Sequence, residues 1–524
     1  MNALFVDRGT VSPKRFTIWS GFLLGVAAAC LAQGEAVAQS GTRGLPGVGL
    51  FSTDSFGQGT GLEPGRRETF TPMLPQQSVD FRTPAKFGLG GPTLALAGAS
   101  PRITDDSSNA LLGGADQQNA RFGGFLDAVG AYTYPSPAHW SRAVGRLQLT
   151  GQGELTDQVK WKIGGRIDVD PVYFSSNFYP DSVNRNQRFS AIWGENYLDF
   201  SVGEWDFRVG AQHVVWGEVV GLFFADVVSA RDMREFLLPS FDIIRIPQWA
   251  ARAEYFAGDS HVEFVWIPVP TFDRIGKPGA EFYPMPLPSP IPPNVAALFP
   301  DPERPARKLG NSNFGVRANT LAAGWDLAAF YYRSFSGEPT FYQVPSAVVG
   351  QPLEFQGRYD RIWQTGGTVT KDFGEFVMRG EAVYTHGQGY SVSDLSAAQL
   401  VVTRPTLDYV LSVEFLLPND TRVNIQGFQR AFFGGGGSDM AVKSDGVGAS
   451  VFISTKLTST LEPQILWIQN FKDAGGLIRP RLNWHAAKNT NVGFGLDIFT
   501  GPANGFFGRY NDRDRLYAEV RYDF

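Results

Sequence analysis

The sequence has very little thiol chemistry available. Cys30 is the only cysteine among 524 residues, and it lies in an N-terminal segment that we expect to be removed. A mature chain without thiols excludes a disulfide framework, cysteine-ligated zinc and covalently attached haem. We therefore expect neither a metal nor a cofactor.

Residues that organise catalysis are also scarce. A P-loop, a GxGxxG turn and an EF-hand loop are missing, and no histidine stands in an HExxH or HxH motif. The five histidines are His139, His213, His261, His386 and His485. These absences argue against an enzyme, and a net charge of −5 gives no reason to expect nucleic acid as a partner.

Long apolar runs are confined to the N-terminus. Basic residues at 14–15 precede the apolar stretch 18–31, and the small-x-small pattern of a signal peptidase site follows at 36–38. We expect residues 1–38 to be a cleaved signal peptide. An inner-membrane anchor is the alternative, but the stretch is shorter than the ~20 residues of a span. A lipoprotein attached through Cys30 is a further alternative.

A two-residue period dominates the rest of the chain. Segments 159–169 and 406–416 each present one apolar face and one polar face. Such alternation is typical of strands that separate an apolar from a polar environment, and the 60 glycines and 14% aromatic residues also favour β structure. A mean hydropathy of −0.14 fits a membrane barrel, since every second residue faces water.

The connections between these segments are sorted by length. Short turns such as 203–204 and 372–374 alternate with long connections such as 216–247 and 268–313. A soluble β-sandwich has no reason to sort its loops, whereas a membrane barrel has one periplasmic and one external rim. We therefore predict an all-β fold, a transmembrane antiparallel β-barrel with short periplasmic turns and long external loops.

The strand count follows from the same alternation. We expect an even total of about 18 strands, with about 16 as the nearest alternative. The predicted strands are 122–134, 143–155, 159–169, 191–202, 205–215, 248–256, 261–267, 314–320, 325–333, 361–371, 375–385, 406–416, 421–430, 446–456, 461–469, 477–485, 491–499 and 513–524.

The alternation continues to the last residue, with Tyr522 and Phe524 on one face. This end resembles the terminal strand of outer-membrane barrels, whose aromatic last residue is recognised by the barrel-insertion machinery. We expect the outer membrane of a Gram-negative bacterium as the location, with the insertion machinery and outer-membrane lipid as partners. The sequence does not specify the oligomeric state.

Three parts follow along the chain. After the signal peptide, residues 39–120 are rich in Gly, Pro, Ser and Thr without clear periodicity. We expect them to form a periplasmic extension or, alternatively, a small plug in the lumen. Residues 121–524 form the predicted barrel.

The long connection 213–247 interleaves charged and apolar residues at helix-compatible spacing around 231–238. Long loops usually fold inward or bind something. We expect a short helical element inside the lumen, forming a constriction whose opposed charges select solutes. The alternative is an external loop with surface ion pairs. The candidate constriction residues are Trp216, Glu218, Asp226, Arg231, Asp232, Arg234, Glu235, Asp242 and Arg245.

A family resemblance is carried by the same stretch, through Gln212, Val214 and Trp216-Gly217-Glu218, then Asp226-Val227 and Arg231-Asp232. It resembles the Q-x-V-x-W-G-E … D-V-x-x-x-R-D motif of a large, poorly characterised family of proteobacterial outer-membrane, porin-like barrels. The resemblance implies partnership with an RND-type exporter of lipids or other apolar compounds. The chain departs from that pattern in its N-terminal extension and its proline-rich segment 268–305, which we expect to be stiff and extended.

The alternation also assigns charged residues to the lumen. They are Lys160, Lys162, Arg166, Asp168, Arg208, Arg252, Glu254, Arg379, Glu381, Arg479 and Arg481. Basic residues are the majority, which favours anionic or amphiphilic solutes. We predict an outer-membrane channel for small or amphiphilic solutes. The alternatives are a lipid or apolar-compound export component with a filled lumen and, less favoured, a hydrolase at the external rim using a loop histidine such as His386.

Overall fold

The structure is a computed structural model that describes residues 120–524, except 220, 222–224, 286–296, 345–351, 394–397, 435–439 and 442–444. The predicted signal peptide, the extension up to residue 119 and the centre of the proline-rich segment lie outside the described residues. Among the described residues, no helix has both the length and the apolar composition needed to cross a bilayer.

One antiparallel sheet closes into a barrel, because β1 pairs with β2 on one side and with β26 on the other. β4 and β5 both pair with β3 and together make one wall strand, so that 19 strand elements give 18 wall strands. This confirms the predicted fold class and the count of 18. The wall strands are β1 (Ala120–Thr133), β2 (His139–Thr156), β3 (Val159–Val169), β4 (Phe189–Trp193), β5 (Asn196–Val202), β6 (Trp205–Gln212), β9 (Gln248–Ala257), β10 (Ser260–Ile267), β12 (Asn313–Ala322), β13 (Trp325–Phe335), β16 (Arg361–Asp372), β17 (Phe376–His386), β20 (Thr406–Leu417), β21 (Thr421–Phe432), β22 (Gly446–Ser454), β23 (Leu461–Asn470), β24 (Gly476–Ala487), β25 (Thr490–Thr500) and β26 (Arg515–Asp523).

The two faces of the wall explain the two-residue period. In β20, Leu411 is 52% exposed on the outside, whereas its neighbour Ser412 is 1% exposed. Outward apolar side chains recur along the other strands, as at Leu149, Phe264 and Val520. An apolar outer surface combined with polar inward residues is stable only where hydrocarbon surrounds the barrel.

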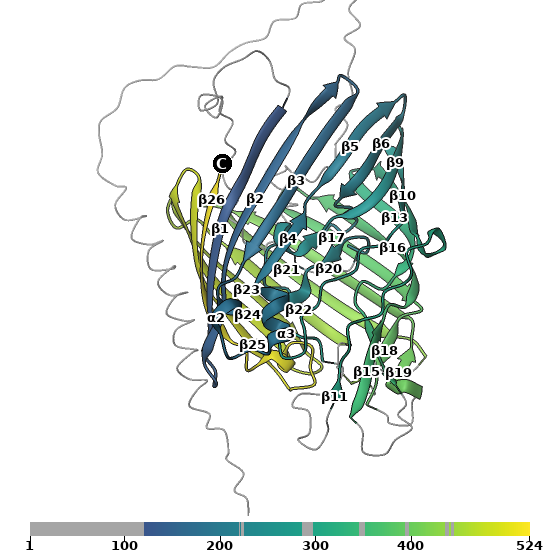
Figure 1. Cartoon of the computed structure of the whole chain (residues 1–524). Coiled ribbons are helices and arrows are strands. Elements are labelled where there is room, and N and C mark those ends of the chain that lie inside the picture. The colour runs from purple at the N-terminus through teal and green to yellow at the C-terminus, as the bar shows by residue number, and fades with distance from the viewer. Residues whose placement is uncertain are drawn as a thin grey trace, which may run out of the picture. The chain divides into compact units, whose positions relative to one another are not determined.

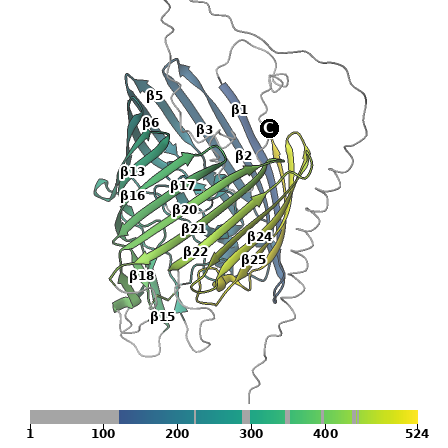
Figure 2. The same cartoon turned by 180° about the vertical axis from the view of Figure 1, so that it is seen from behind.

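The two rims differ as predicted. Short turns and the C-terminus lie at the upper rim in Figure 1, and most of the long connections lie at the lower rim (Figures 1 and 2). Phe524 closes the wall at the short-turn rim, where its backbone N–H donates to the Gly124 carbonyl at 3.0 Å and its carbonyl accepts from the Gly124 N–H at 2.8 Å.

The long connections contain small elements that the sequence pattern did not predict. The helices are α2 (Val172–Ser175) and α3 (Asp181–Gln187), and the short strands are β11 (Ala297–Leu298), β14 (Thr340–Val344), β15 (Leu353–Arg358), β18 (Gly389–Ser391) and β19 (Val401–Thr403). A buried cluster that includes Tyr173, Val183, Tyr283, Phe341 and Phe355 holds several of them together. These elements are too short to carry a period of their own, so only tertiary packing fixes them.

Candidate functional site: a segment inside the barrel

The connection between β6 and β9 leaves the wall and enters the barrel. β6 ends at Gln212 rather than at the predicted residue 215, because Val214 and Trp216 turn away from the sheet and are each 1% exposed. We call residues 213–246 the crossing segment. It contains β7 (Ala230–Arg231), η2 (Met233–Glu235), α4 (Phe241–Ile244) and β8 (Arg245–Ile246), with β7 and β8 paired.

The first half of the crossing segment packs on one side of the wall. Trp216 contacts the rings of Phe330 and Tyr332 on β13, with centroid distances of 5.2 and 5.7 Å. Its indole N–H donates to Glu263 on β10 at 3.3 Å. An indole buried to this degree needs both apolar contact and a hydrogen-bond acceptor. The W-G-E part of the sequence motif therefore has an anchoring role.

Glu381 and Glu218 hold the part of the crossing segment that follows Trp216. Glu381 on β17 accepts hydrogen bonds from the backbone N–H groups of Glu218, Val219 and Ala225, the last at 3.0 Å. Glu218 pairs with Arg317 on β12 at 3.1 Å and accepts from Thr368 on β16 at 2.9 Å. This half is thus tied to the wall between β10 and β17.

An ion pair and two hydrogen bonds hold the middle of the crossing segment. Arg245 contacts Asp226 at 3.0 Å, and Arg231 donates to the Asp226 carbonyl at 2.6 Å. The Arg231 N–H donates to Asp273 at 2.7 Å. Burial raises the pKa of Asp273 to about 7, and the nearby Arg231 only partly opposes this effect.

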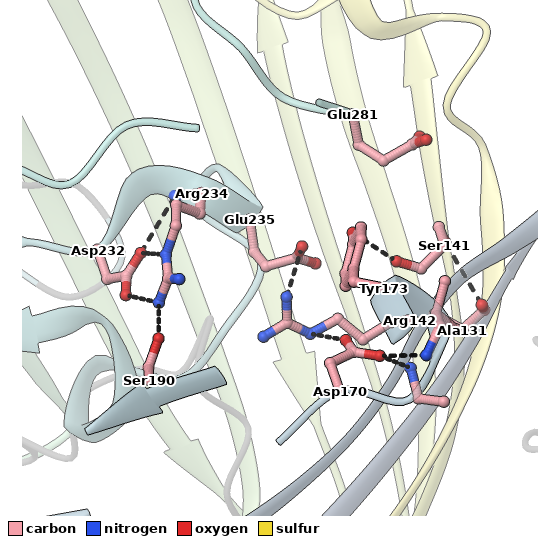
Figure 3. A network of polar contacts seen from close by, with 12 residues as sticks. Ala131, Ser141, Arg142, Asp170, Tyr173, Ser190, Asp232, Arg234, Glu235 and Glu281 are labelled. Carbon is pink, nitrogen blue, oxygen red and sulfur yellow. Dashed lines mark hydrogen bonds and ion pairs between the residues drawn. The ribbon is translucent and has the colours of Figure 1, made fainter. Parts of the chain in front are cut away.

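Asp232 and Arg234 form a compact pair at the start of η2 (Figure 3). Arg234 contacts both oxygens of Asp232 at 2.8 and 2.6 Å and also donates to Ser190 at 3.0 Å. Burial alone would raise the pKa of Asp232, but the Arg234 guanidinium lowers it to about 2. Asp232 is therefore ionised across the physiological pH range.

The second half of the crossing segment contacts the other side of the wall. Glu235 pairs with Arg142 on β2 at 2.8 Å, and Arg142 also lies 3.7 Å from Asp170 (Figure 3). Glu235 pairs with Arg515 on β26 as well, also at 2.8 Å. Asp242 pairs with Arg521 on β26 at 3.0 Å. Two backbone carbonyls add to this attachment, since Leu238 accepts from Arg479 and Ile243 accepts from Arg166.

These two sets of anchors lie on opposite walls. Counting from β1 along the paired strands, β13 is the ninth of the 18 wall strands and β26 is the eighteenth. The crossing segment therefore spans the barrel interior from one wall to the other. All nine candidate constriction residues belong to it, and the structure links each of them to the wall, to a loop or to another part of the segment.

A small cavity of about 60 Å³ remains between the second half of the segment and the wall. Its charged lining has five arginines and three carboxylates: Arg142, Arg146, Arg479, Arg481, Arg515, Glu235, Asp497 and Glu519. Of these residues, the sequence alone predicts only Arg479, Arg481 and Glu235 as part of the site. The other lining charges stand at inward positions of β2, β25 and β26, where the alternation would have assigned them to the lumen. That they lie together in one cavity depends on how the crossing segment folds.

The predicted lumen-facing charges are mostly paired with neighbours in the wall. Arg208 contacts Asp199 at 2.6 Å, Arg379 contacts Glu414 at 2.9 Å, and Arg481 contacts Glu519 at 2.8 Å. The remaining pairs are Lys162–Glu195, Arg166–Asp168, Arg252–Glu254 and Arg479–Asp497. Lys160 differs from these residues. It is half-exposed near the short-turn rim, and its distance of 3.7 Å to Glu154 is longer than in the other pairs.

The histidines are not gathered into one site. His139 pairs with Glu281 of the 268–313 connection at 2.7 Å, whereas His386 stacks on Trp363 with a centroid distance of 5.3 Å. His485 contacts Glu462 at 3.5 Å near the short-turn rim.

Comparison with known proteins gives a family and a set of similar folds. Among curated proteins, none matches the sequence. Acinetobacter baumannii OccAB3 is 10% identical and has a TM-score of 0.45, with 78% of this chain and 99% of that chain covered. Pseudomonas aeruginosa OpdK with vanillate has the same identity, TM-score and coverage of this chain, with 98% of its own chain covered. Salmonella typhi OmpF in complex with daunomycin is 8% identical, with a TM-score of 0.40, 77% of this chain covered and 97% of its own.

A family model described as "Protein of unknown function (DUF1302)" matches residues 148–462, which is more than half of the chain. The match runs from β2 to β23 and includes the whole crossing segment. The chain therefore belongs to the DUF1302 family of proteins of unknown function.

Proposed function

We propose that the protein is an outer-membrane channel for small or amphiphilic solutes, in which the crossing segment narrows the path through the barrel. The observation that carries this proposal is the attachment of residues 213–246 to opposite walls, by Glu218 and Glu381 on one side and Glu235 on the other. A barrel of 18 strands is wide enough for an aqueous lumen, so an internal segment decides what passes.

The charges beside the crossing segment support a preference for anions. The gap between residues 235–243 and the wall is lined by more arginines than carboxylates. Fixed charges at a narrow, poorly screened place act strongly on a passing ion. The proposed channel therefore favours anionic solutes and anionic amphiphiles over cations of equal size.

The Arg481–Glu519 pair allows a test in which structural and electrostatic effects separate. Arg481→Gln and Glu519→Gln break the same 2.8 Å ion pair but change the charge of the gap in opposite directions. We expect stepwise conductance in planar bilayers, with the anion preference reduced severalfold in Arg481→Gln and increased in Glu519→Gln. The measurement is the reversal potential in a salt gradient.

Arg430→Gln is the matched control, because Arg430 pairs with Asp408 in the β20–β21 wall and does not line the gap. A shift of the same sign in both test variants would contradict the electrostatic part of the proposal. A barrel that never conducts would contradict the channel itself.

A second candidate function is a component of a lipid or apolar-compound export route. The observation in its favour is the apolar filling around Phe236, which is buried against Phe282, Phe499, Phe507 and Tyr510 inside the barrel. This candidate predicts a non-conducting protein that co-purifies with lipid, detectable by mass spectrometry of an organic extract.

A further inference from the structure

Two arginines lie on the outer face of the wall, on the neighbouring strands β13 and β16 (Figure 2). Arg333 on β13 is exposed, whereas Tyr332 and Ser334 on either side of it are buried. Arg361 on β16 pairs with Phe335, which lies two residues after Arg333 and on the same face. Because alternate residues of a strand share a face, both guanidinium groups are directed away from the lumen. Diagonal neighbours of this kind lie roughly 7–8 Å apart, so both side chains can reach one ligand.

These two arginines differ from the lumen-facing ones because they lack a carboxylate partner. Arg379, for example, pairs with Glu414 inside the barrel. No carboxylate in the described part of the chain lies within ion-pair distance of Arg333 or Arg361. Asp360, next to Arg361, is already occupied, because it accepts from one backbone and two side-chain donors. Two uncompensated positive charges on the lipid side of the wall attract anionic head groups.

Arg361 is held in place by neutral groups. Its guanidinium donates to the backbone carbonyls of Ser312 and Gly310, each at 3.1 Å, and lies over the Phe335 ring at 3.8 Å. Arg333 makes no hydrogen bond within the described part of the chain. A guanidinium has five N–H donors, so donors of both side chains remain for a ligand. The carbonyls orient Arg361 and leave its charge uncompensated.

Aromatic side chains mark the depth of the arginines in the membrane. Arg333 belongs to a row of cross-strand partners with Phe314, Trp363 and His386. Tyr331, two residues further from the rim, stacks on Trp363 with a centroid distance of 6.2 Å. Aromatic girdles of transmembrane barrels lie at the level of the lipid head groups. The arginines therefore lie where phosphate groups are found.

The length of β16 indicates the leaflet. Arg361 is its first residue, and Lys371 lies near its other end on the same outward face. At about 3.3 Å per residue and a tilt of about 40°, the strand between them covers roughly 25 Å along the membrane normal, the height of the apolar band. Lys371 lies 4.8 Å from the Trp325 ring beside the short turn, so the arginines lie at the rim of the long connections. Long loops of bacterial barrels are external, which places the arginines at the outer leaflet.

We propose that Arg333 and Arg361 form a binding site for a phosphate monoester on a lipid of the outer leaflet. A phosphate monoester carries nearly two negative charges and three acceptor oxygens, which match two guanidinium groups better than the single charge of a phosphodiester does. The planar fork of arginine also fits phosphate oxygens bidentately. This site is independent of the proposed channel, because both side chains lie outside the lumen.

The test compares dioleoylphosphatidate with dioleoylphosphatidylglycerol, which have the same acyl chains but carry a monoester and a diester phosphate, respectively. Native mass spectrometry of the purified full-length protein with equal amounts of both should show severalfold more phosphatidate adduct. Lipid A, whose phosphates are monoesters, should displace phosphatidate, whereas inorganic phosphate at the same concentration should not. Equal binding of the two lipids overturns the preference for a monoester, and displacement by inorganic phosphate overturns the lipid as occupant.

Arg333→Gln is the main variant, because it removes a charge without removing a hydrogen bond of the described structure. It should weaken phosphatidate binding about tenfold, the equivalent of one charge-assisted hydrogen bond. Arg333→Lys keeps the charge but loses the fork, so its affinity should lie between the two. Lys371→Gln is the matched control, because it removes one charge from the same outer face at the opposite rim. It should bind phosphatidate as the native protein does.

Equal losses of binding in Arg333→Gln and Lys371→Gln would show an effect of overall charge and overturn the site. Native binding by both Arg333→Gln and Arg361→Gln would overturn it as well. If Arg333→Gln does not assemble, judged by heat-modifiable migration in gels, Arg333→Lys and Arg361→Gln give the same comparison with Lys371→Gln. A barrel that shows the lipid preference but does not conduct overturns the channel and leaves this site standing.

Discussion

Single acceptors have large effects in this protein because backbone groups inside the barrel depend on them. Glu381 alone receives three N–H groups of the crossing segment, and in the described structure each of these donors is directed at its carboxylate. A main-chain donor left without a partner in a buried place costs ~1–3 kcal/mol. The backbone positions of Glu218, Val219 and Ala225 therefore depend on a side chain that lies more than 150 residues away in the sequence.

Removing that acceptor should loosen the segment locally. We expect Glu381→Ala to lower the free energy of unfolding by about 2 kcal/mol or more, with Glu381→Gln, which keeps one oxygen acceptor, losing less. Hydrogen exchange of the backbone N–H groups at 218, 219 and 225 measures the effect directly. Unchanged exchange in Glu381→Ala would show that the segment is held by other contacts.

Asp273 makes the folding stability of the protein depend on pH. Its pKa, raised to about 7 by burial, exceeds the ordinary value of 3.8, so folding favours the protonated form. The stabilisation is fully present below pH 3.8 and is lost as the pH rises through about 7, by a few kcal/mol at most. Arg231 lowers this pKa, whereas Glu338 and Asp226 raise it.

Asp273→Asn mimics the protonated state and should remove this dependence. We expect the native protein to be less stable than Asp273→Asn at pH 8, with the difference shrinking towards pH 5. Thermal unfolding at the two pH values measures it. Parallel curves for the two proteins would mean that Asp273 is ionised throughout.

At the scale of the element, strands were predictable and loops were not. In a wall strand, side chains face lipid and lumen alternately over about ten positions. The strand at 159–169 is therefore recognisable from the alternation of apolar and polar residues in the sequence. Strand ends were less certain, as at β6, where Trp216 finds its partners on β10 and β13 rather than in the sheet. Helices α2 and α3 have too few residues for a period, and their positions follow from contacts with distant segments.

The last strand, β26, should show the greatest sensitivity to one residue. Phe524, which directly follows this strand, makes two main-chain hydrogen bonds with Gly124 that complete the closure of the barrel. Deleting Phe524 removes both bonds and the aromatic end expected to be recognised during insertion. We expect a severalfold drop in assembled protein, measured as the heat-modifiable fraction of the membrane-bound pool. Phe373→Ala, at an exposed aromatic of the same rim, serves as the control and should assemble normally.

At the scale of the whole molecule, the sequence predicted the wall and an inward loop at 213–247, but not the wall residues that contact this loop. The alternation of apolar and polar residues and the alternation of short and long loops were sufficient to predict the closed sheet, because the bilayer imposes both patterns on a barrel. The candidate residues of the crossing segment were also visible as a charged stretch in a long loop. Their partners were not, since Arg142, Arg317 and Arg515 come from strands that meet the segment only after the barrel has closed.

A wall one strand thick has little resistance to flattening, and lateral pressure in a bilayer acts on it from all sides. The crossing segment connects strands on opposite sides of the barrel through ion pairs in both of its halves. This attachment therefore adds resistance to flattening beyond that of the hydrogen-bonded wall. We expect release of either end to change the cross-section of the barrel as well as the width of the gap beside the segment.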